Sequence, residues 1–260
     1  MEGGRIDREL AQRLRRALSA GSEELYQVLQ DPSPEVLRTA LKNRNLSEDH
    51  LLALLRRRDL SEDLTKAIHQ MERFRKSHRL QLALVRNIAT PGPVVLSLLP
   101  YLHLFELLDL CILPGITPDQ RYAAERQIVQ RLPTTELGSK LTLARRGTAS
   151  LLGHLLKEGE PALVRSCLDS SRLREVDVAQ FIVSARAAAE TLSMVARHPR
   201  WKNRPNLKLA LLRNPGTPGV WFTVFLPQLK TAEINNLLAS RGLSPQQKTL
   251  IREELQRRSR

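Results

Sequence analysis

One stretch of this sequence occurs twice, and the repetition constrains the fold more than any other feature. The segment RLQLALVRNIATPGPVV begins at Arg79, and the related segment NLKLALLRNPGTPGVWF begins at Asn206. A shift of 127 residues aligns the two, and twelve of the 23 paired positions from Leu80 to Leu102 are then identical. This spacing predicts that one block of structure is present twice.

The same shift aligns other parts of the chain without a gap. The further matches pair Pro34 with Pro161, Gly115 with Gly242, and Phe74 with Trp201. Agreement at several separate places under one shift indicates a tandem duplication. One half lies near residues 5–131 and the other near residues 132–258.

Each half also repeats within itself. The pair Ala40-Leu41 recurs 43 residues later as Ala83-Leu84, and a further alanine-rich segment at Ala123-Ala124 follows after a similar interval. Periods near 40 residues are typical of arrays in which each unit holds two or more short helices. Leu84 and its counterpart Leu211 are expected to lie in the core.

Local signals mark where the helices begin and end. A Thr or Ser before Pro predicts an N-cap followed by the first helical residue, because the hydroxyl caps a free N–H and Pro has none to lose. Such pairs are Thr90-Pro91, Thr117-Pro118, Thr217-Pro218 and Ser244-Pro245. Ser47 and Ser61 precede acidic residues and predict similar starts. Asn87 is expected to end a helix in the left-handed conformation. These signals predict some sixteen to eighteen short helices and no strand.

Composition agrees with a helical fold. Apolar residues make up 42% of the chain and aromatic residues only 4%, with leucine dominating.

No apolar run is long enough for a membrane span, and the first ten residues lack the apolar core of a secretory signal. Cys111 and Cys167 lie in leucine-rich segments, so we expect buried free thiols and a cytoplasmic protein without membrane contact.

A family resemblance appears at these residues. The segments ALVRNIATPGPVV, ALLRNPGTPGVWF and ALKNRNLSEDHLL resemble leucine-rich repeat variant and HEAT-like repeats of uncharacterised bacterial proteins. The resemblance implies an all-α, right-handed α-solenoid that forms one continuous domain over residues 1–260. The resemblance specifies hardly any function, because such arrays serve many partners. A curved stack of helices offers a long concave surface, so we expect a non-enzymatic scaffold that binds a protein partner there.

Charge is distributed unevenly over a chain whose net charge is +14. Residues 1–130 carry 19 basic and 17 acidic residues, whereas residues 131–260 carry 22 and 10. Basic residues surround one tryptophan in the second half, and no acid lies between Glu190 and Glu233. The candidate contacts for an anion or partner are Arg197, Arg200, Trp201, Lys202, Arg204, Lys208 and Arg213.

The basic segment leaves two interpretations open. Cations beside an aromatic suit a surface that follows phosphates and stacks on bases, so the alternative function is nucleic-acid binding by the second half. Trp201 and Phe74 can instead fill the core, with the cations solvated. A DNA glycosylase with a HEAT-like fold is a weaker alternative. Such an enzyme needs an acid in its basic cleft, and no acid lies between Glu190 and Glu233.

Other motifs of chemistry are missing from the sequence. It has neither of the glycine-rich phosphate-binding patterns, and its six histidines do not stand at metal-ligand spacing. We therefore expect no catalytic residue, no cofactor and no metal. The triplet Arg56-Arg57-Arg58 is expected to lie at a helix C-terminus, where cations suit the helix dipole.

Overall fold

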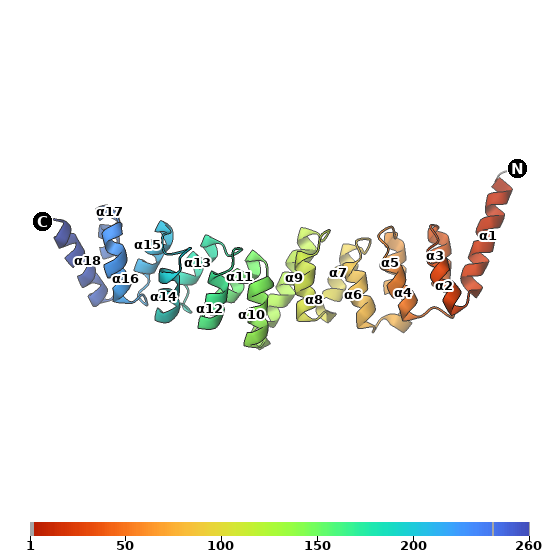
Figure 1. Cartoon of the computed structure of the whole chain (residues 1–260), viewed down its shortest axis with the longest axis horizontal. Coiled ribbons are helices and arrows are strands. Elements are labelled where there is room, and N and C mark those ends of the chain that lie inside the picture. The colour runs from red at the N-terminus through yellow and green to blue at the C-terminus, as the bar shows by residue number, and fades with distance from the viewer. Residues whose placement is uncertain (1–2, 241, 260) are drawn as a thin grey trace. The chain divides into compact units, whose positions relative to one another are not determined.

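The structure is a computed structural model that describes residues 3–240 and 242–259. Over these residues the chain is all α, with eighteen α-helices, four short 3-10 helices and no strand (Figure 1). This confirms the expected all-α class and the expected number of helices. The chain divides into two compact units, with the boundary between Gln130 and Arg131.

Nine α-helices begin in the first unit, drawn red to yellow-green in Figure 1. They are α1 (Gly3–Ser19), α2 (Ser22–Val28), α3 (Pro34–Ala40), α4 (Glu48–Leu54), α5 (Glu62–His69), α6 (His78–Arg86), α7 (Gly92–Leu98), α8 (Leu104–Ile112) and α9 (Pro118–Arg131). Two 3-10 helices interrupt the series, η1 (Glu72–Phe74) and η2 (Leu99–Tyr101).

The second unit, drawn green to blue, holds the other nine α-helices. They are α10 (Leu137–Arg146), α11 (Ala149–Leu156), α12 (Pro161–Leu168), α13 (Glu175–Ile182), α14 (Ala189–Arg197), α15 (Pro205–Arg213), α16 (Gly219–Phe225), α17 (Thr231–Leu238) and α18 (Pro245–Arg258). Its 3-10 helices are η3 (Leu132–Thr134) and η4 (Leu226–Gln228). None of the described helices is long and apolar enough to cross a bilayer.

Within each unit, a helix packs against the next helix but one. In the first unit α1 packs on α3 and α3 on α5, while α2 packs on α4 and α4 on α6. In the second unit α10, α12 and α14 follow one another in the same way, as do α11, α13 and α15. Helices this short are not stable alone, so each depends on burying its apolar side against such neighbours.

The predicted core residues are buried. Leu84 is 3% exposed and Leu211 is 2% exposed, which confirms that both belong to the core. Cys111 and Cys167 are buried free cysteines, as expected. Burial raises the pKa of each thiol to about 12, because a thiolate is poorly solvated there.

Asn87 ends helix α6, but not in the predicted conformation. Its φ and ψ are −84° and 125°, which is extended rather than left-handed. The reason lies in its side chain, whose Nδ2 donates hydrogen bonds of 2.8 Å to the carbonyl oxygens of both Leu55 and Arg57. Its Oδ1 accepts one of 2.9 Å from the N–H of Ala89. The asparagine therefore ties the turn after α6 to the end of α4.

Two other asparagines make equivalent ties. Asn214 donates from Nδ2 to the carbonyl oxygen of Ile182, which connects the end of α15 to the end of α13. Asn43 donates to the carbonyl oxygen of Ala17 at 2.9 Å, which connects the end of α3 to α1. In each case the asparagine connects its helix to the helix two places earlier in the chain, and those two helices also pack on each other.

The Thr-Pro and Ser-Pro pairs divide into two kinds. Ser244 caps α18 and Thr117 caps α9 as predicted, since the backbone N–H three residues later donates to each hydroxyl. The prediction is wrong for Thr90, because α7 begins at Gly92 with Pro91 as its N-cap. The Thr90 hydroxyl instead donates a bond of 2.6 Å to the carbonyl oxygen of Leu84.

Thr217 shows the same departure. Helix α16 begins at Gly219 with Pro218 as its N-cap. The hydroxyl of Thr217 donates a bond of 2.6 Å to the carbonyl oxygen of Leu211, 127 residues beyond Leu84. In both units the threonine hydroxyl therefore donates to a carbonyl group of the preceding helix and does not cap an N–H group of the next one.

Candidate binding surfaces

The basic segment, defined as residues 197–213, joins α14 to α15 and continues along α15. Its tryptophan is buried: Trp201 is 2% exposed, and its Nε1 donates a hydrogen bond of 3.1 Å to the carbonyl oxygen of Leu168. The ring fills the space between helices, so it is not available for stacking on a base. Its counterpart under the 127-residue shift is Phe74, whose side chain lies outside the described residues.

Arg200 is also used by the protein itself. Its guanidinium donates to the carbonyl oxygens of Ser170, Ser171 and Leu173, at 2.7, 3.1 and 3.0 Å. It lies 4.3 Å from the centre of the Trp201 ring. These carbonyl groups lie in the turn between α12 and α13, so Arg200 connects that turn to the segment after α14.

Three further cations of the segment have partners within the second unit. Arg197 donates to the carbonyl oxygen of Ser193 at 3.2 Å, Arg204 lies 3.6 Å from a carboxylate oxygen of Glu175, and Lys208 lies 2.6 Å from the amide oxygen of Gln228. Lys202 and Arg213 are exposed and have no partner among the described residues. The segment is acid-free in sequence, but folding supplies an acid from α13.

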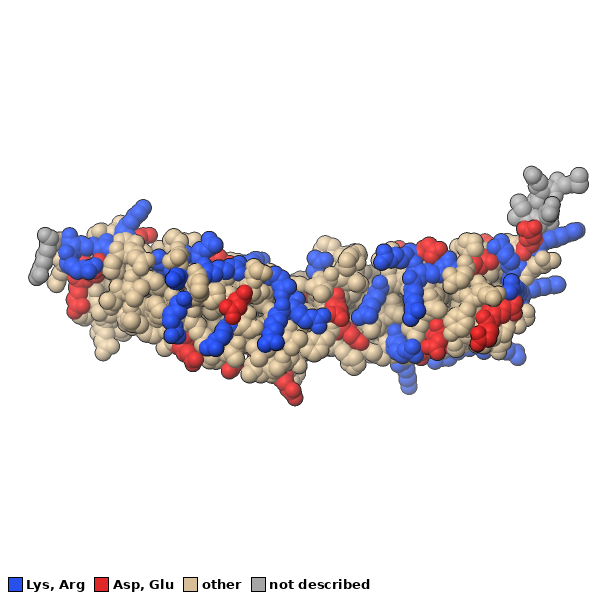
Figure 2. Space-filling model, in the orientation of Figure 1, with Lys and Arg blue, Asp and Glu red and all other residues tan. Residues whose placement is uncertain are grey.

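Other cations are spread over the surface. Figure 2 shows basic side chains (blue) over this face of both units, with acidic side chains (red) between them. Basic charge alone therefore does not single out a site. A site needs cations gathered around a hollow.

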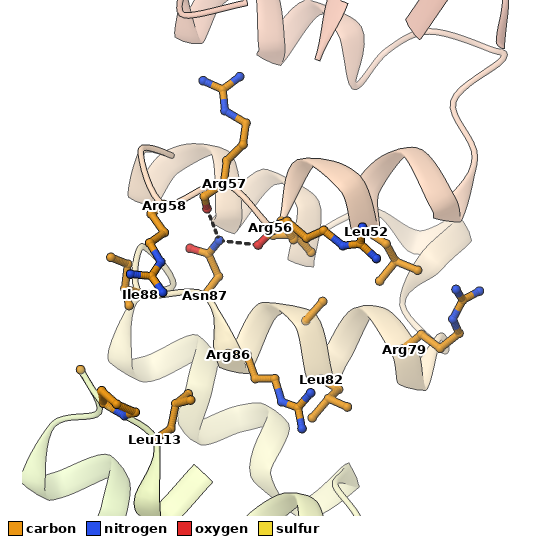
Figure 3. A pocket seen from close by; sticks show the side chains of 14 residues that line it. Leu52, Arg56, Arg57, Arg58, Arg79, Leu82, Arg86, Asn87, Ile88 and Leu113 are labelled. Carbon is orange, nitrogen blue, oxygen red and sulfur yellow. Dashed lines mark hydrogen bonds between the residues drawn. The ribbon is translucent and has the colours of Figure 1, made fainter. Parts of the chain in front are cut away.

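The first unit has such a hollow, a groove of about 770 Å³ that we call the arginine groove (Figure 3). It is lined by α4 and α6 and by the turns that follow α4, α6 and α8. Its apolar lining includes Leu52, Leu82, Ile88 and Leu113. Its basic lining includes Arg56, Arg58, Arg79 and Arg86.

The arginine triplet splits between structure and surface. Arg57 donates to the carbonyl oxygens of Leu29 and Asp31, at 2.7 and 3.0 Å, and Figure 3 shows its side chain pointing away from the groove. Its hydrogen bond with Asp59 raises the pKa of its guanidinium. Arg56 and Arg58 are exposed, and within residues 3–240 and 242–259 they have no side-chain partner.

The other two arginines of the groove lie near acids. Arg79 lies 3.3 Å from carboxylate oxygens of both Glu48 and Asp49. Arg86 lies 3.8 Å from a carboxylate oxygen of Asp109, which is too far for a hydrogen bond. The uncompensated charge of the arginine groove therefore comes mainly from Arg56 and Arg58.

The second unit shows that the helices do not require this charge. Under the 127-residue shift, Arg56 corresponds to Val183, which is 72% exposed, and Arg58 corresponds to Ala185. The helices on either side, α13 and α15, correspond to α4 and α6 and pack in the same way. The packing of two such helices therefore does not depend on arginine at positions 56 and 58.

Sequence reasoning placed Arg56 and Arg58 with Arg57 at a helix C-terminus and did not group them with Arg79 and Arg86. The residues lie in different helices and turns, and only packing brings them to one groove. A position-by-position comparison of the two halves was the available signal, because it shows cations that one half has and the other lacks.

The chain matches no protein-family model, no curated protein and no solved structure.

Proposed function

We propose that this protein is a non-enzymatic helical-repeat scaffold that binds a protein partner. In this proposal the helices form a right-handed α-solenoid of HEAT-like units in two tandem halves, and the partner lies on the concave surface. Equivalent hydrogen bonds support the duplication: the Asn87 tie recurs at Asn214, and the Thr90 bond recurs at Thr217. The boundary of the compact units also lies within two residues of the boundary between the expected halves.

The architecture has a direct test in solution. A compact protein of 260 residues has a radius of gyration of about 18 Å. A solenoid is longer than it is wide, so small-angle X-ray scattering should give a clearly larger value and a skewed distance distribution. A value of about 18 Å would contradict the solenoid.

The arginine groove carries the proposal about the partner. A guanidinium binds a carboxylate through two parallel N–H groups, so the two unpaired arginines suit Asp and Glu side chains. The leucine and isoleucine side chains between them suit apolar residues of the same partner. No aromatic residue occurs among the 14 residues that line the groove, so bases have nothing to stack on. The groove therefore fits an acidic segment that also carries apolar side chains.

A labelled peptide rich in Glu and Leu tests this assignment by fluorescence anisotropy. The Arg56→Val/Arg58→Ala variant carries the residues of the second unit at these positions, so it should fold. Each lost charged hydrogen bond is worth about 1.5 kcal/mol or more, so affinity should fall at least about tenfold. A peptide with Ser in place of Leu should bind more weakly than the original.

The Lys202→Ala/Arg213→Ala variant is the matched control, because it removes the same charge from exposed positions elsewhere. Its affinity for the peptide should change less than about twofold. Equal losses in the two variants would mean that only net charge matters. Binding of a single-stranded oligonucleotide without binding of the peptide would replace the protein partner with nucleic acid.

Nucleic-acid binding by the second half stays the alternative proposal. The observation that favours it is the exposure of Lys202 and Arg213, which have no partner in the described structure. Two free cations support only weak contact with a phosphate backbone. This makes the second unit a secondary candidate behind the arginine groove.

A further inference from the structure

Three side chains that can bind a metal ion converge where α6 and α8 begin. His78 is the first residue of α6, His103 directly precedes α8, and Glu106 lies in the first turn of α8. Their ligand atoms all lie within 4.8 Å of one another. His78 Nε2 is 2.8 Å from Glu106 Oε2, and the centres of the two imidazole rings are 4.3 Å apart.

The backbone holds the carboxylate in place. Glu106 Oε2 accepts a hydrogen bond of 2.7 Å from the N–H of His103. The side chains of His78 and Glu106 are 35% and 19% exposed, and His103 is exposed. A hydrated ion therefore reaches the three groups directly from solvent, without displacing any of the apolar core.

Comparison with the second unit shows that the hydrogen bond that caps α8 does not depend on the two histidines. Under the 127-residue shift, Glu106 corresponds to Glu233, which accepts the same capping bond, at 2.8 Å, from the N–H of Lys230. Lys230 stands where the first unit has His103, and Pro205 stands where it has His78. The cap therefore needs the glutamate but neither histidine, so the pair of imidazoles is an addition to the first unit.

An ordinary ion pair between histidine and a carboxylate is the competing explanation. The chain contains such a pair in His198 and Asp169, whose Nε2 and Oδ1 atoms are 3.1 Å apart. That pair is not part of a three-residue ligand group in the described structure. A second imidazole beside the first is what distinguishes His78, His103 and Glu106.

We propose that His78, His103 and Glu106 bind a divalent transition-metal ion, with zinc the best match. Imidazole nitrogen and carboxylate oxygen are the ligands that zinc takes in three-residue protein sites, where a water or another ligand fills the fourth position. The ion would join the start of α6 to the start of α8. This site is independent of the arginine groove, and neither proposal depends on the other.

Calorimetric titration of the full chain with Zn²⁺ tests the site, and Co²⁺ reports its geometry. We expect one ion per chain and the intense visible absorption of four- or five-coordinate Co²⁺. His103→Lys introduces the residue of the second unit and keeps the cap, so it should fold and lose affinity at least about tenfold. Zinc should raise the melting temperature of the wild type but not of this variant.

His78→Gln provides a second variant, with loss of affinity expected again, and circular dichroism verifies that both variants fold. His198→Gln is the control and should leave zinc binding unchanged. Wild-type affinity no greater than that of His103→Lys would overturn the proposal. So would a weak, octahedral Co²⁺ spectrum, or loss of binding in the His198 variant alone.

Discussion

The side-chain amide of Asn87 donates a hydrogen bond of 2.8 Å to the main-chain carbonyl oxygen of Leu55, at the end of α4. The same nitrogen also donates to Arg57. One buried and one partly buried carbonyl group after α4 thus share one amide donor. The bond explains why an asparagine stands after α6 although its backbone is extended rather than left-handed.

Replacing Asn87 with Ala should destabilise the protein by about 1–3 kcal/mol, because the carbonyl groups lose their donor while staying largely out of water. Urea unfolding followed by circular dichroism measures the change. Asn203→Ala is the control, since Asn203 is exposed, and its midpoint should match the wild type. An unchanged midpoint for Asn87→Ala would show that water replaces the lost bonds at no cost.

Truncation of the paired core leucines should cost more. Leu84→Ala and Leu211→Ala should each lower the free energy of unfolding by about 2–5 kcal/mol, because each removes buried apolar contacts and leaves a cavity. Leu96→Ala serves as the control, because Leu96 is 43% exposed. If the Leu96 variant lost as much stability as the other two, burial would not be the cause.

The two cysteines should react slowly while the protein is folded. A pKa of about 12 leaves a thiolate fraction of roughly 10⁻⁴ at pH 8, and burial also blocks the reagent. Mass spectrometry after iodoacetamide treatment should show no labelling of Cys111 or Cys167 under conditions that label both in urea. Rapid labelling of either native thiol would contradict its burial.

Acid should weaken the last helix through Glu254. Hydrogen bonds from Arg258 and Arg257, at 2.8 and 2.7 Å, hold the pKa of this carboxyl below its ordinary 4.5. The ionised group therefore stabilises the fold above that value, and the contribution is lost as pH falls through the lower folded pKa. The difference in urea midpoint between wild type and Glu254→Gln should shrink below about pH 4.5. Glu253→Gln, at an exposed position, should show no such trend.

The basic segment should bind nucleic acid weakly. Because Arg200 stabilises the fold, the informative variant is Lys202→Ala/Arg213→Ala. Loss of two phosphate contacts should reduce the slope of log affinity against log salt by about 1.8, measured by anisotropy with a labelled duplex. The Arg56→Val/Arg58→Ala variant should keep the wild-type slope. The reverse pattern would move any nucleic-acid contact to the first unit.

Local features of the sequence predicted the fold better than the surface. Ser244 as a helix cap depends on a partner three residues away, so the sequence contains the whole interaction. Thr90 has the same Thr-Pro signature as Thr117, yet only packing decides that its hydroxyl turns back to Leu84. Sequence alone does not distinguish the two cases.

The arginines were harder to assign for a different reason. Arg200 and Arg57 donate to main-chain carbonyl groups about 30 residues earlier in the chain. Every residue has a main-chain carbonyl group, so the sequence does not indicate which carbonyl group accepts the hydrogen bond. Which arginine is used by the fold and which one, like Arg56, stays free becomes visible only in the structure.

The asparagine ties also bear on how the chain is synthesised. Asn87 and Asn214 each reach a carbonyl 32 residues earlier, so neither waits for a distant part of the sequence. A ribosome adds about 5–20 residues per second, so each acceptor is followed by its donor within about 2–6 s. A nascent chain can therefore complete its ties in order, and each newly emerged helix can find its neighbour already in place.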